Sequence, residues 1–282
     1  MTIDVSDKTA RALGALTRFY RTPLAASFEA RRAADIERHV VEFFRAVVQS
    51  VPAYREFLRA RAFDPASVRS LSDFARVPRT TKEDYHRVYP MAARCRGGNL
   101  EGSDFFAVSS GSTGEAFFWP RFVSDELGTA ERFEHVLCHG FAADRRRTLG
   151  VVCFALGSWV GGMDKTAACR HLAAKGHPLA LVTPGNQRAE ILRAVRALAG
   201  EFDQIVLFGY PPFVKDVIDA GLADGLDWTK LELRLVLAGE VFSEEWRSLV
   251  SLRAGITDPS RHVASLYGTA DAGVVANETP LS

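Results

Sequence analysis

The chain is poor in cysteine and in net charge. Its 282 residues include only four cysteines, Cys95, Cys138, Cys153 and Cys169, and no C-x-x-C pair. The spacing that structural zinc requires is therefore missing, and nothing indicates a disulfide framework. Such cysteine usage is typical of proteins from a reducing compartment.

The net charge is also too small to indicate a nucleic-acid partner. There are 35 basic and 34 acidic residues, so the formal charge is only +1, which argues against a dedicated nucleic-acid binder. The first thirty residues contain no apolar stretch long enough for a signal peptide or a membrane span. We therefore expect a cytoplasmic protein with no membrane and no nucleic-acid partner.

Charge and pattern divide the chain into two parts. Residues 1–99 hold 18 basic and 11 acidic side chains, a net of +7, which leaves −6 for residues 100–282. In the first part, apolar residues from Phe28 to Val51 recur with a helical period that stops at Pro52, and we predict one long helix there. Thr81 with Asp84 three residues later is typical of a further helix cap. We predict a helical N-terminal region over residues 1–99.

The second part alternates β-rich and helical segments. Strands are predicted at residues 104–108, 116–123, 148–156, 179–182, 204–208, 233–237 and 262–267, and most are separated by helical segments. This alternation indicates an α/β fold with a mainly parallel sheet flanked by helices, formed by residues 100–282. Ligands of such folds bind at the carboxyl ends of strands. Five segments follow predicted strands there: residues 109–114, 157–162, 209–212, 239–240 and 267–273.

The first of these segments is a serine- and glycine-rich loop. It consists of Ser109, Ser110, Gly111, Ser112, Thr113 and Gly114. Hydroxyls and free backbone N–H groups can surround a polyphosphate without a dedicated cation. The loop is not a Walker A motif, and the chain has neither G-x-G-x-x-G nor G-x-S-x-G. The alternative is a plain connection between the two strands of a hairpin.

Taken in order, these motifs resemble the adenylate-forming (acyl-CoA synthetase/ligase) superfamily, and within it the phenylacetate–CoA ligase-like branch. The loop is similar to the phosphate loop of that superfamily. Further similar segments are residues 51–55, 64–65, 71–74, 77–84 and 89–90, the Leu-Ala-Gly-Glu segment 237–245, and Tyr-Gly-Thr-Ala-Asp at 267–271. The ordered series from about Val51 to about Gly273 makes the resemblance specific, because each motif alone is weak.

The resemblance implies a reaction in two steps. Enzymes of this superfamily join a carboxylate to the α-phosphate of ATP, and then pass the acyl group to a thiol such as that of coenzyme A. The implied cofactors are therefore ATP, Mg²⁺ and coenzyme A or another acceptor thiol. Two anions must meet in this reaction, so the site needs neutralisation of charge more than a strong base.

The resemblance also assigns roles to single residues. Residues 109–114 would hold the β- and γ-phosphates, and Glu240 and Asp271 would be catalytic as oxygen ligands of Mg²⁺. The residues that would line the adenine and the α-phosphate are Gly239, Tyr267, Gly268 and Thr269. A small carboxylic acid, of aryl or arylacetic type, would lie among Trp159, Gly161, Gly162, Phe208, Gly209, Tyr210 and Pro211, because glycine beside aromatic rings admits a flat apolar group. Ordinary core packing is the alternative for these aromatic residues, and no Lys or Arg in the segments is an evident carboxylate partner.

The chain departs from the family pattern in several places. Glu115 stands where the phosphate loop usually has a basic residue, and Asp271 replaces a Glu. Only nine residues follow Gly273, and they match none of the later family segments: the Asp that contacts the ribose, the hinge, and the mobile C-terminal domain with its adenylation Lys. We expect this chain to be the N-terminal portion alone, with self-association or a separate C-terminal partner.

Three functions stay open at this point. The chain is the N-terminal part of a carboxylate-activating ligase, or a non-catalytic relative that acts as a ligand-binding or interaction module, or an unrelated α/β enzyme with another phosphate ligand. Two further features have plain structural explanations. His135 and His139 share a helix face and can bind a metal or simply pack, and residues 145–147 form a short basic run at a helix end.

Overall fold

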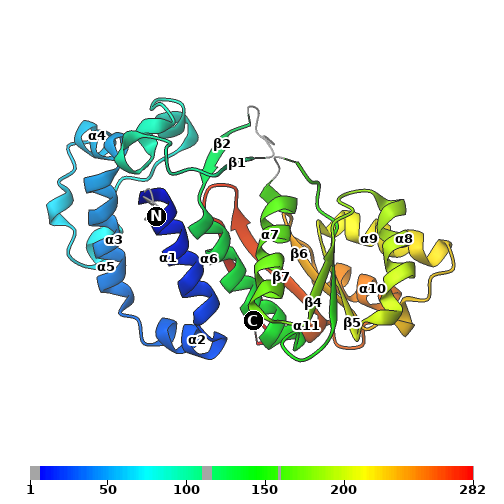
Figure 1. Ribbon diagram of the computed structural model, residues 1–282. Helices are drawn as coiled ribbons and strands as arrows, with labels where there is room; N and C mark the ends of the chain where they lie inside the picture. The colour runs from blue at the N-terminus through cyan, green and yellow to red at the C-terminus, as the bar shows by residue number, and fades with distance from the viewer. Residues whose placement is uncertain (1–6, 110–115, 158–159, 282) are drawn as a thin grey trace. The chain divides into compact units, whose positions relative to one another are not determined.

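The computed structural model describes residues 7–109, 116–157 and 160–281 (Figure 1). Two compact units divide the chain: residues 1–24 with 104–282 form the first, and residues 25–103 form the second. The phosphate-loop residues Ser110, Gly111, Ser112, Thr113 and Gly114, together with Glu115 and Trp159, lie outside the described residues. Within the described parts of the chain, no helix is both long enough and apolar enough to cross a membrane.

The second unit is helical. Its elements are α2 (Leu24–Arg32), α3 (Ile36–Ser50), α4 (Pro52–Ala60), η1 (Pro65–Ser67), α5 (Leu71–Phe74), η2 (Lys82–His86), η3 (Ala92–Arg94) and η4 (Arg96–Gly98). A small core forms around Phe44, Phe57, Leu58 and Tyr85. The predicted cap of Thr81 with Asp84 is confirmed, since each accepts a hydrogen bond from the backbone N–H of the other at 2.7–3.1 Å.

The prediction of one long helix from Phe28 to Val51 is wrong. The chain breaks between Arg32 and Ile36, and α2 and α3 are separate helices. The Asp35 side chain accepts a hydrogen bond from the backbone N–H of Arg38 at 3.0 Å, which caps the start of α3. The residues that carry the apolar period begin at Ile36, so the period and the cap both mark the start of α3, and the predicted helix was extended too far back to Phe28.

The first unit is the α/β body, and the first helix of the chain belongs to it. Its strands are β1 (Phe105–Val108), β2 (Phe118–Arg121), β3 (Thr148–Val152), β4 (Leu179–Val182), β5 (Gln204–Gly209), β6 (Leu233–Ala238), β7 (Val263–Thr269) and β8 (Gly273–Asn277). Its helices are α1 (Asp7–Arg21), α6 (Val123–Glu134), η5 (His135–Gly140), α7 (Val160–Lys175), α8 (Arg188–Leu198), η6 (Ala199–Glu201), α9 (Pro211–Ala223), η7 (Trp228–Lys230), α10 (Glu244–Ala254) and α11 (Pro259–His262).

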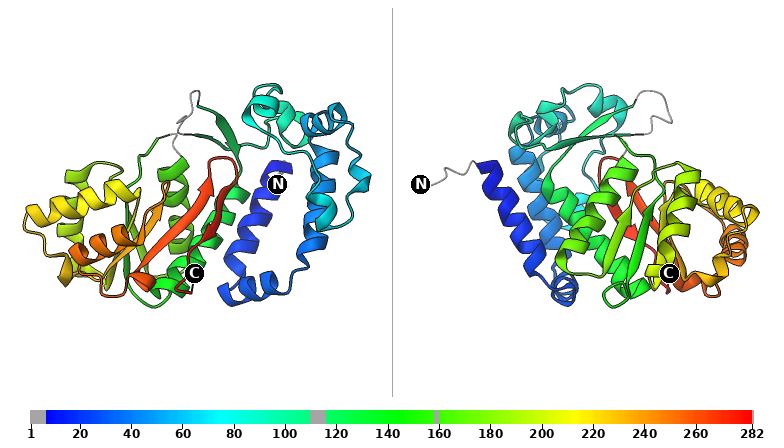
Figure 2. Two further views of the ribbon diagram at one scale, coloured as in Figure 1. Left: turned by 180° about the vertical axis from the view of Figure 1, so that it is seen from behind. Right: turned by 45° about the vertical axis from the view of Figure 1, so that its right-hand side comes forward.

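The six-stranded sheet has the order β4-β3-β5-β6-β7-β8, and β1 pairs with β2 in a separate antiparallel hairpin. Neighbouring strands from β4 to β7 are parallel. The edge strand β8 is antiparallel to β7 and was not among the predicted strands; Figure 2 shows these two strands side by side in orange and red. The mainly parallel α/β fold is confirmed.

Alternate side chains of the sheet serve two cores. On β5, Val206 and Phe208 face the core that α1, α6 and α7 cover, whereas Ile205 and Leu207 face the core under α8, α9 and α10 (Figure 1). Every residue of β5 is buried. A strand covered on both faces reads as a continuous apolar run, which is why these strands were detectable in the sequence.

Candidate functional site at the carboxyl edge of the sheet

Four neighbouring parallel strands end at one edge of the sheet. Strands β3, β5, β6 and β7 are adjacent in that order. Their carboxyl ends therefore meet, and the segments that follow them gather at this edge. Four of the five predicted site segments follow these strands at this edge: residues 157–162, 209–212, 239–240 and 267–273.

The segment after β5 is fixed by close packing. Gly209 is buried, and a Cβ placed on it would lie 2.3 Å from Val214 Cγ2 and 3.4 Å from Cys153 Cβ. Tyr210 then caps α9 with extended backbone angles, and Pro211 takes the first helical position. Proline suits that position because its missing N–H has no partner in a helix anyway. The Tyr210 side chain is thereby held at the edge, where it is 39% exposed.

Tyr210 meets the segment that follows β6. Its hydroxyl donates a hydrogen bond to Glu240 Oε2 at 3.5 Å. Gly239 has a φ of +94°, and a Cβ there would lie 3.4 Å from the Tyr210 ring. Glycine at this position permits both the left-handed backbone and the approach of the tyrosine. The predicted acid-pocket and nucleotide segments are therefore in direct contact.

The segment after β7 is shaped by a bulge and by an arginine. A Cβ on Gly268 would lie 2.5 Å from the carbonyl oxygen of Gly273, so the bulge between β7 and β8 needs glycine there. Thr269 Oγ1 accepts a hydrogen bond from the backbone N–H of Ala272 at 3.2 Å. Arg121 of β2 donates to the carbonyl oxygens of Ala270 and Asp271. These bonds attach the turn that carries Asp271 to the β1–β2 hairpin.

The segment after β3 packs tightly on the start of α7. A Cβ on Gly162 would lie 2.4 Å from the carbonyl oxygen of Ala155, and one on Gly161 would lie 3.2 Å from Phe154 Cδ1. Phe208, predicted in the acid pocket, is fully buried and stacks on Phe133 at a centroid distance of 5.8 Å. Its ring therefore supports the edge from the core.

Ser109 is the one phosphate-loop residue that the structure describes. Its Oγ accepts a hydrogen bond from the backbone N–H of Phe117 at 3.0 Å, and its own N–H donates to the Phe117 carbonyl oxygen at 3.0 Å. Both bonds close the hairpin of β1 and β2. The Ser109 side chain therefore stabilises the hairpin, as in the alternative interpretation of this loop as a plain hairpin connection.

A buried lysine at the start of α7 was missed by the sequence argument. Lys165 is 8% exposed, and its ammonium lies 5.6 Å from the centroid of the Phe154 ring. Burial lowers the pKa of Lys165, and the nearby Arg121 charge lowers it further, while Asp164 opposes the change. Burial also raises the pKa of the Asp164 carboxyl. The available signal was a lysine on the apolar face of α7, one turn before Cys169.

The carboxylates at the edge suit Mg²⁺ only in combination with a phosphate ligand. Glu240 and Asp271 are exposed and follow adjacent strands. No group of three metal-ligating side chains exists among the described residues. Mg²⁺ is commonly held by one or two carboxylates, with phosphate oxygens and waters completing its shell. The donors present fit that mode and do not form a cage for the metal alone.

A cysteine, a histidine and a glutamate also lie together on the α6 side of the sheet. Cys138 Sγ is 3.8 Å from His177 Nδ1, and His177 Nε2 is 2.8 Å from Glu134 Oε1. Burial, together with the charges of Glu134 and Asp144, raises the pKa of Cys138 to about 12. A nucleophilic cysteine requires the opposite shift. Glu134 also accepts a hydrogen bond from Lys175 at 2.7 Å, so the cluster is a buried polar anchor between α6 and α7.

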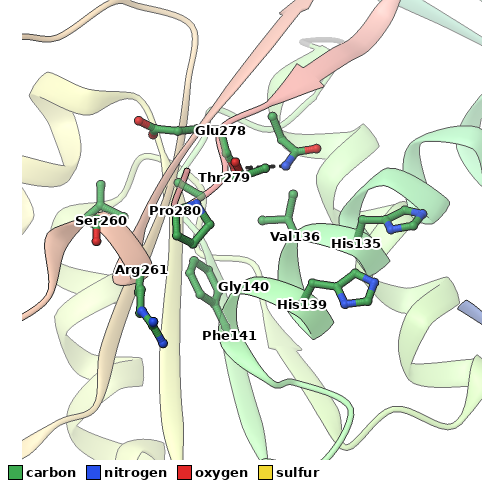
Figure 3. Close-up of a pocket in the computed structure, with 13 residues that line it drawn as sticks. His135, Val136, His139, Gly140, Phe141, Ser260, Arg261, Glu278, Thr279 and Pro280 are labelled. Atoms are coloured by element: carbon green, nitrogen blue, oxygen red, sulfur yellow. Dashed lines mark hydrogen bonds between the residues drawn. The ribbon is translucent and has the colours of Figure 1, made fainter. Parts of the chain in front are cut away.

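A small cavity lies at the other end of β7. It has a volume of about 140 Å³, and Phe141, Val263 and Pro280 are among its lining residues. Figure 3 shows the imidazoles of His135 and His139 beside one another at its margin, and their centroids are 5.5 Å apart. The carboxylate of Glu278 in its wall is occupied by Arg247 at 2.6 Å and by the N–H of Ser265 at 3.0 Å. The described lining contains no acid–base or nucleophile arrangement for chemistry.

Known proteins resemble this chain in sequence and in fold. No family model matches the chain. The chain is 25% identical over 244 residues to a phenylacetate-coenzyme A ligase from Aromatoleum evansii, an alignment that covers 82% of this chain and 50% of that enzyme. The resemblance to phenylacetate–CoA ligase is confirmed. The chain spans about half the length of the curated relative it matches.

Solved structures share the fold. A 2-hydroxyisobutyryl-CoA ligase in an open conformation, in complex with 2-HIB-AMP and CoA, superposes with a TM-score of 0.63 at 18% identity, covering 82% of this chain and 48% of that one. The same ligase in its thioesterification state gives a TM-score of 0.63 at 18% identity, with 94% of this chain and 50% of that chain covered. The fold expected from the sequence, that of one part of an adenylate-forming enzyme, is therefore confirmed.

Proposed function

We propose that this chain is the nucleotide- and acid-binding N-terminal part of an ATP-dependent carboxylate-activating ligase. Its reaction would form an acyl-adenylate and then a thioester with coenzyme A or another thiol. The substrate would be a small carboxylic acid, with an aryl or arylacetic acid favoured by the likeness to phenylacetate–CoA ligase. The observation that supports the proposal most strongly is the contact of Tyr210 with Gly239 and Glu240, because it joins the two binding segments at one edge.

The proposed roles follow from the position of each segment. Gly239, Tyr267, Gly268 and Thr269 would receive the adenine and the α-phosphate, and residues 109–114 the terminal phosphates. Glu240 and Asp271 would hold Mg²⁺, which when bound would neutralise phosphate charge. The acid would lie between Gly161–Gly162 and Gly209–Pro211, with Tyr210 on its nucleotide side.

Calorimetric titration of the 282-residue chain tests this proposal. We expect binding of ATP·Mg²⁺ and of an acyl sulfamoyl adenosine, a mimic of the acyl-adenylate that carries no triphosphate and needs no metal. The Asp271→Asn variant should weaken ATP·Mg²⁺ binding by about tenfold, the effect of losing one charged ligand, and should leave the mimic nearly unaffected.

The control is Asp216→Asn, which changes an exposed carboxylate of α9. It should leave both affinities unchanged. Failure of the wild-type chain to bind either nucleotide would refute the proposal and favour a non-catalytic interaction module. An equal loss of both ligands in Asp271→Asn would remove Asp271 from the metal-binding role.

A further inference from the structure

Lys165 is the buried cation closest in sequence to the proposed acid-binding segment. It is 92% buried, and among the described residues its ammonium makes no hydrogen bond and has no carboxylate within 4 Å. The ammonium lies 5.6 Å from the centroid of the Phe154 ring. A buried charge is costly when it has no hydrogen-bonded counter-charge, so it needs a specific reason to be there.

The direction of the side chain supplies that reason. Long side chains on a helix point back toward its N-terminus, and α7 begins at the carboxyl edge of the sheet. This usual direction leads from Lys165 toward Gly161, one turn earlier. Phe154, over which the ammonium lies, is also the residue that contacts Gly161. The ammonium thus lies over an aromatic ring that borders the acid-binding segment.

The surroundings of Lys165 leave its charge unbalanced. The charged and titratable groups that act on it are Asp164 and Cys169 of α7 and Arg121 of β2. Asp164 is itself disfavoured as an anion by burial, and it also faces Asp125 and Glu126 of α6. Arg121 adds a second positive charge, and its Nε atom is buried without a hydrogen-bond partner. An added anion would be stabilised at this position.

We propose that the Lys165 ammonium is the counter-charge for a carboxylate of the acid substrate. This inference rests on the proposed function and assigns it a positioning residue that also determines specificity. The carboxylate is either the reacting group or a second acidic group on the substrate, and the experiment separates these two sources.

The test compares phenylacetate with 4-carboxyphenylacetate, two acids that differ by one carboxylate, in calorimetric titrations of the full chain and of Lys165→Met. Methionine has a similar length without charge. The control is Lys230→Met, which removes an 80% exposed ammonium from another part of the chain. If Lys165 binds the reacting carboxylate, Lys165→Met weakens both acids by about tenfold or more, and leaves the affinity for ATP·Mg²⁺ nearly unchanged. If it binds a second carboxylate, the wild type prefers 4-carboxyphenylacetate and the variant loses only that preference.

The pH profile gives a readout that a purely structural lysine would not change. Acid affinity of the wild type should fall as pH rises and Lys165 loses its proton, and this fall should be absent in Lys165→Met. Equal affinities for the acids and equal pH profiles in the wild type and Lys165→Met would overturn the inference. If the chain still bound nucleotide in that case, the proposed function would stand. If neither acid nor nucleotide binds, the inference and the proposed function both fail.

Discussion

Replacing Gly209 by alanine tests whether close packing fixes the exit of β5. The new Cβ would lie 2.3 Å from Val214 Cγ2, far inside van der Waals contact, and Val214 is fully buried. Forcing one extra methyl group into such a core typically costs about 1–3 kcal/mol. For a chain of this size each kcal/mol lowers Tm by about 2–4 °C, so we expect a decrease of about 2–12 °C.

The assay is thermal unfolding followed by circular dichroism, with Gly200→Ala as the matched control. A Cβ on Gly200 meets no atom within 4 Å, so its Tm should hardly change. Adding Val214→Ala to Gly209→Ala should recover part of the loss, since the new methyl group then fills the space that the valine leaves. Equal melting temperatures for Gly209→Ala and Gly200→Ala would show that the close approach has no energetic weight. Gly209→Ala should also weaken nucleotide binding, because a shift of the backbone at position 209 would move Tyr210, the next residue.

Three further predictions concern buried charges. Lys165→Met should stabilise the chain at pH 7 by about 1–3 kcal/mol in urea unfolding. Because burial lowers the pKa of Lys165, wild-type stability should rise with pH from its folded pKa up to the unfolded value of 10.5, and the variant should lose this rise. Arg247→Met should destabilise by about 1.5–3 kcal/mol, because the 8% exposed guanidinium donates hydrogen bonds to Glu244 and Glu278; no loss in urea unfolding would contradict the pairing. Burial of Glu134 opposes ionisation, but hydrogen bonds from His177 and Lys175 lower its pKa overall. Stability should therefore fall as pH drops below the unfolded value of 4.5, and Glu134→Gln should show a weaker dependence on pH.

The parallel sheet was predictable because its central strands β3, β5 and β6 are buried on both faces. The runs of apolar residues at β3, β5 and β6 exceed what surface segments carry, and the helices after β5 and β6 begin at a proline and at a capping serine. The strand β8 was not predictable in this way. It is an edge strand with exposed Val275, and its pairing with β7 depends on a glycine bulge. The break before α3 was missed because the helix was extended back to Phe28, beyond Ile36, where the apolar period begins.

The site was predictable as a set of segments and not as a set of contacts. Motif order placed Tyr210 and Gly239 at strand ends, but their contact depends on the neighbouring positions of β5 and β6 in the sheet. The pattern also could not distinguish an aromatic residue that lines a pocket from one that supports it, and Phe208 proved to be core. Lys165 was overlooked because a helical period treats a lysine as solvent-exposed.

The charges at the edge explain why a buried lysine is useful there. Glu240 and Asp271 are exposed carboxylates, and they oppose the approach of both a nucleotide and an acid. A metal ion held by these carboxylates would reverse that effect for phosphates, but an acid that enters from the β3 side needs a cation of its own. Arg121 is committed to the carbonyl oxygens of Ala270 and Asp271, whereas the Lys165 ammonium has no such acceptor in the described structure. In the proposed function, the two anions would therefore meet different sources of positive charge: the nucleotide a metal ion held by the exposed carboxylates, and the acid the buried ammonium of Lys165.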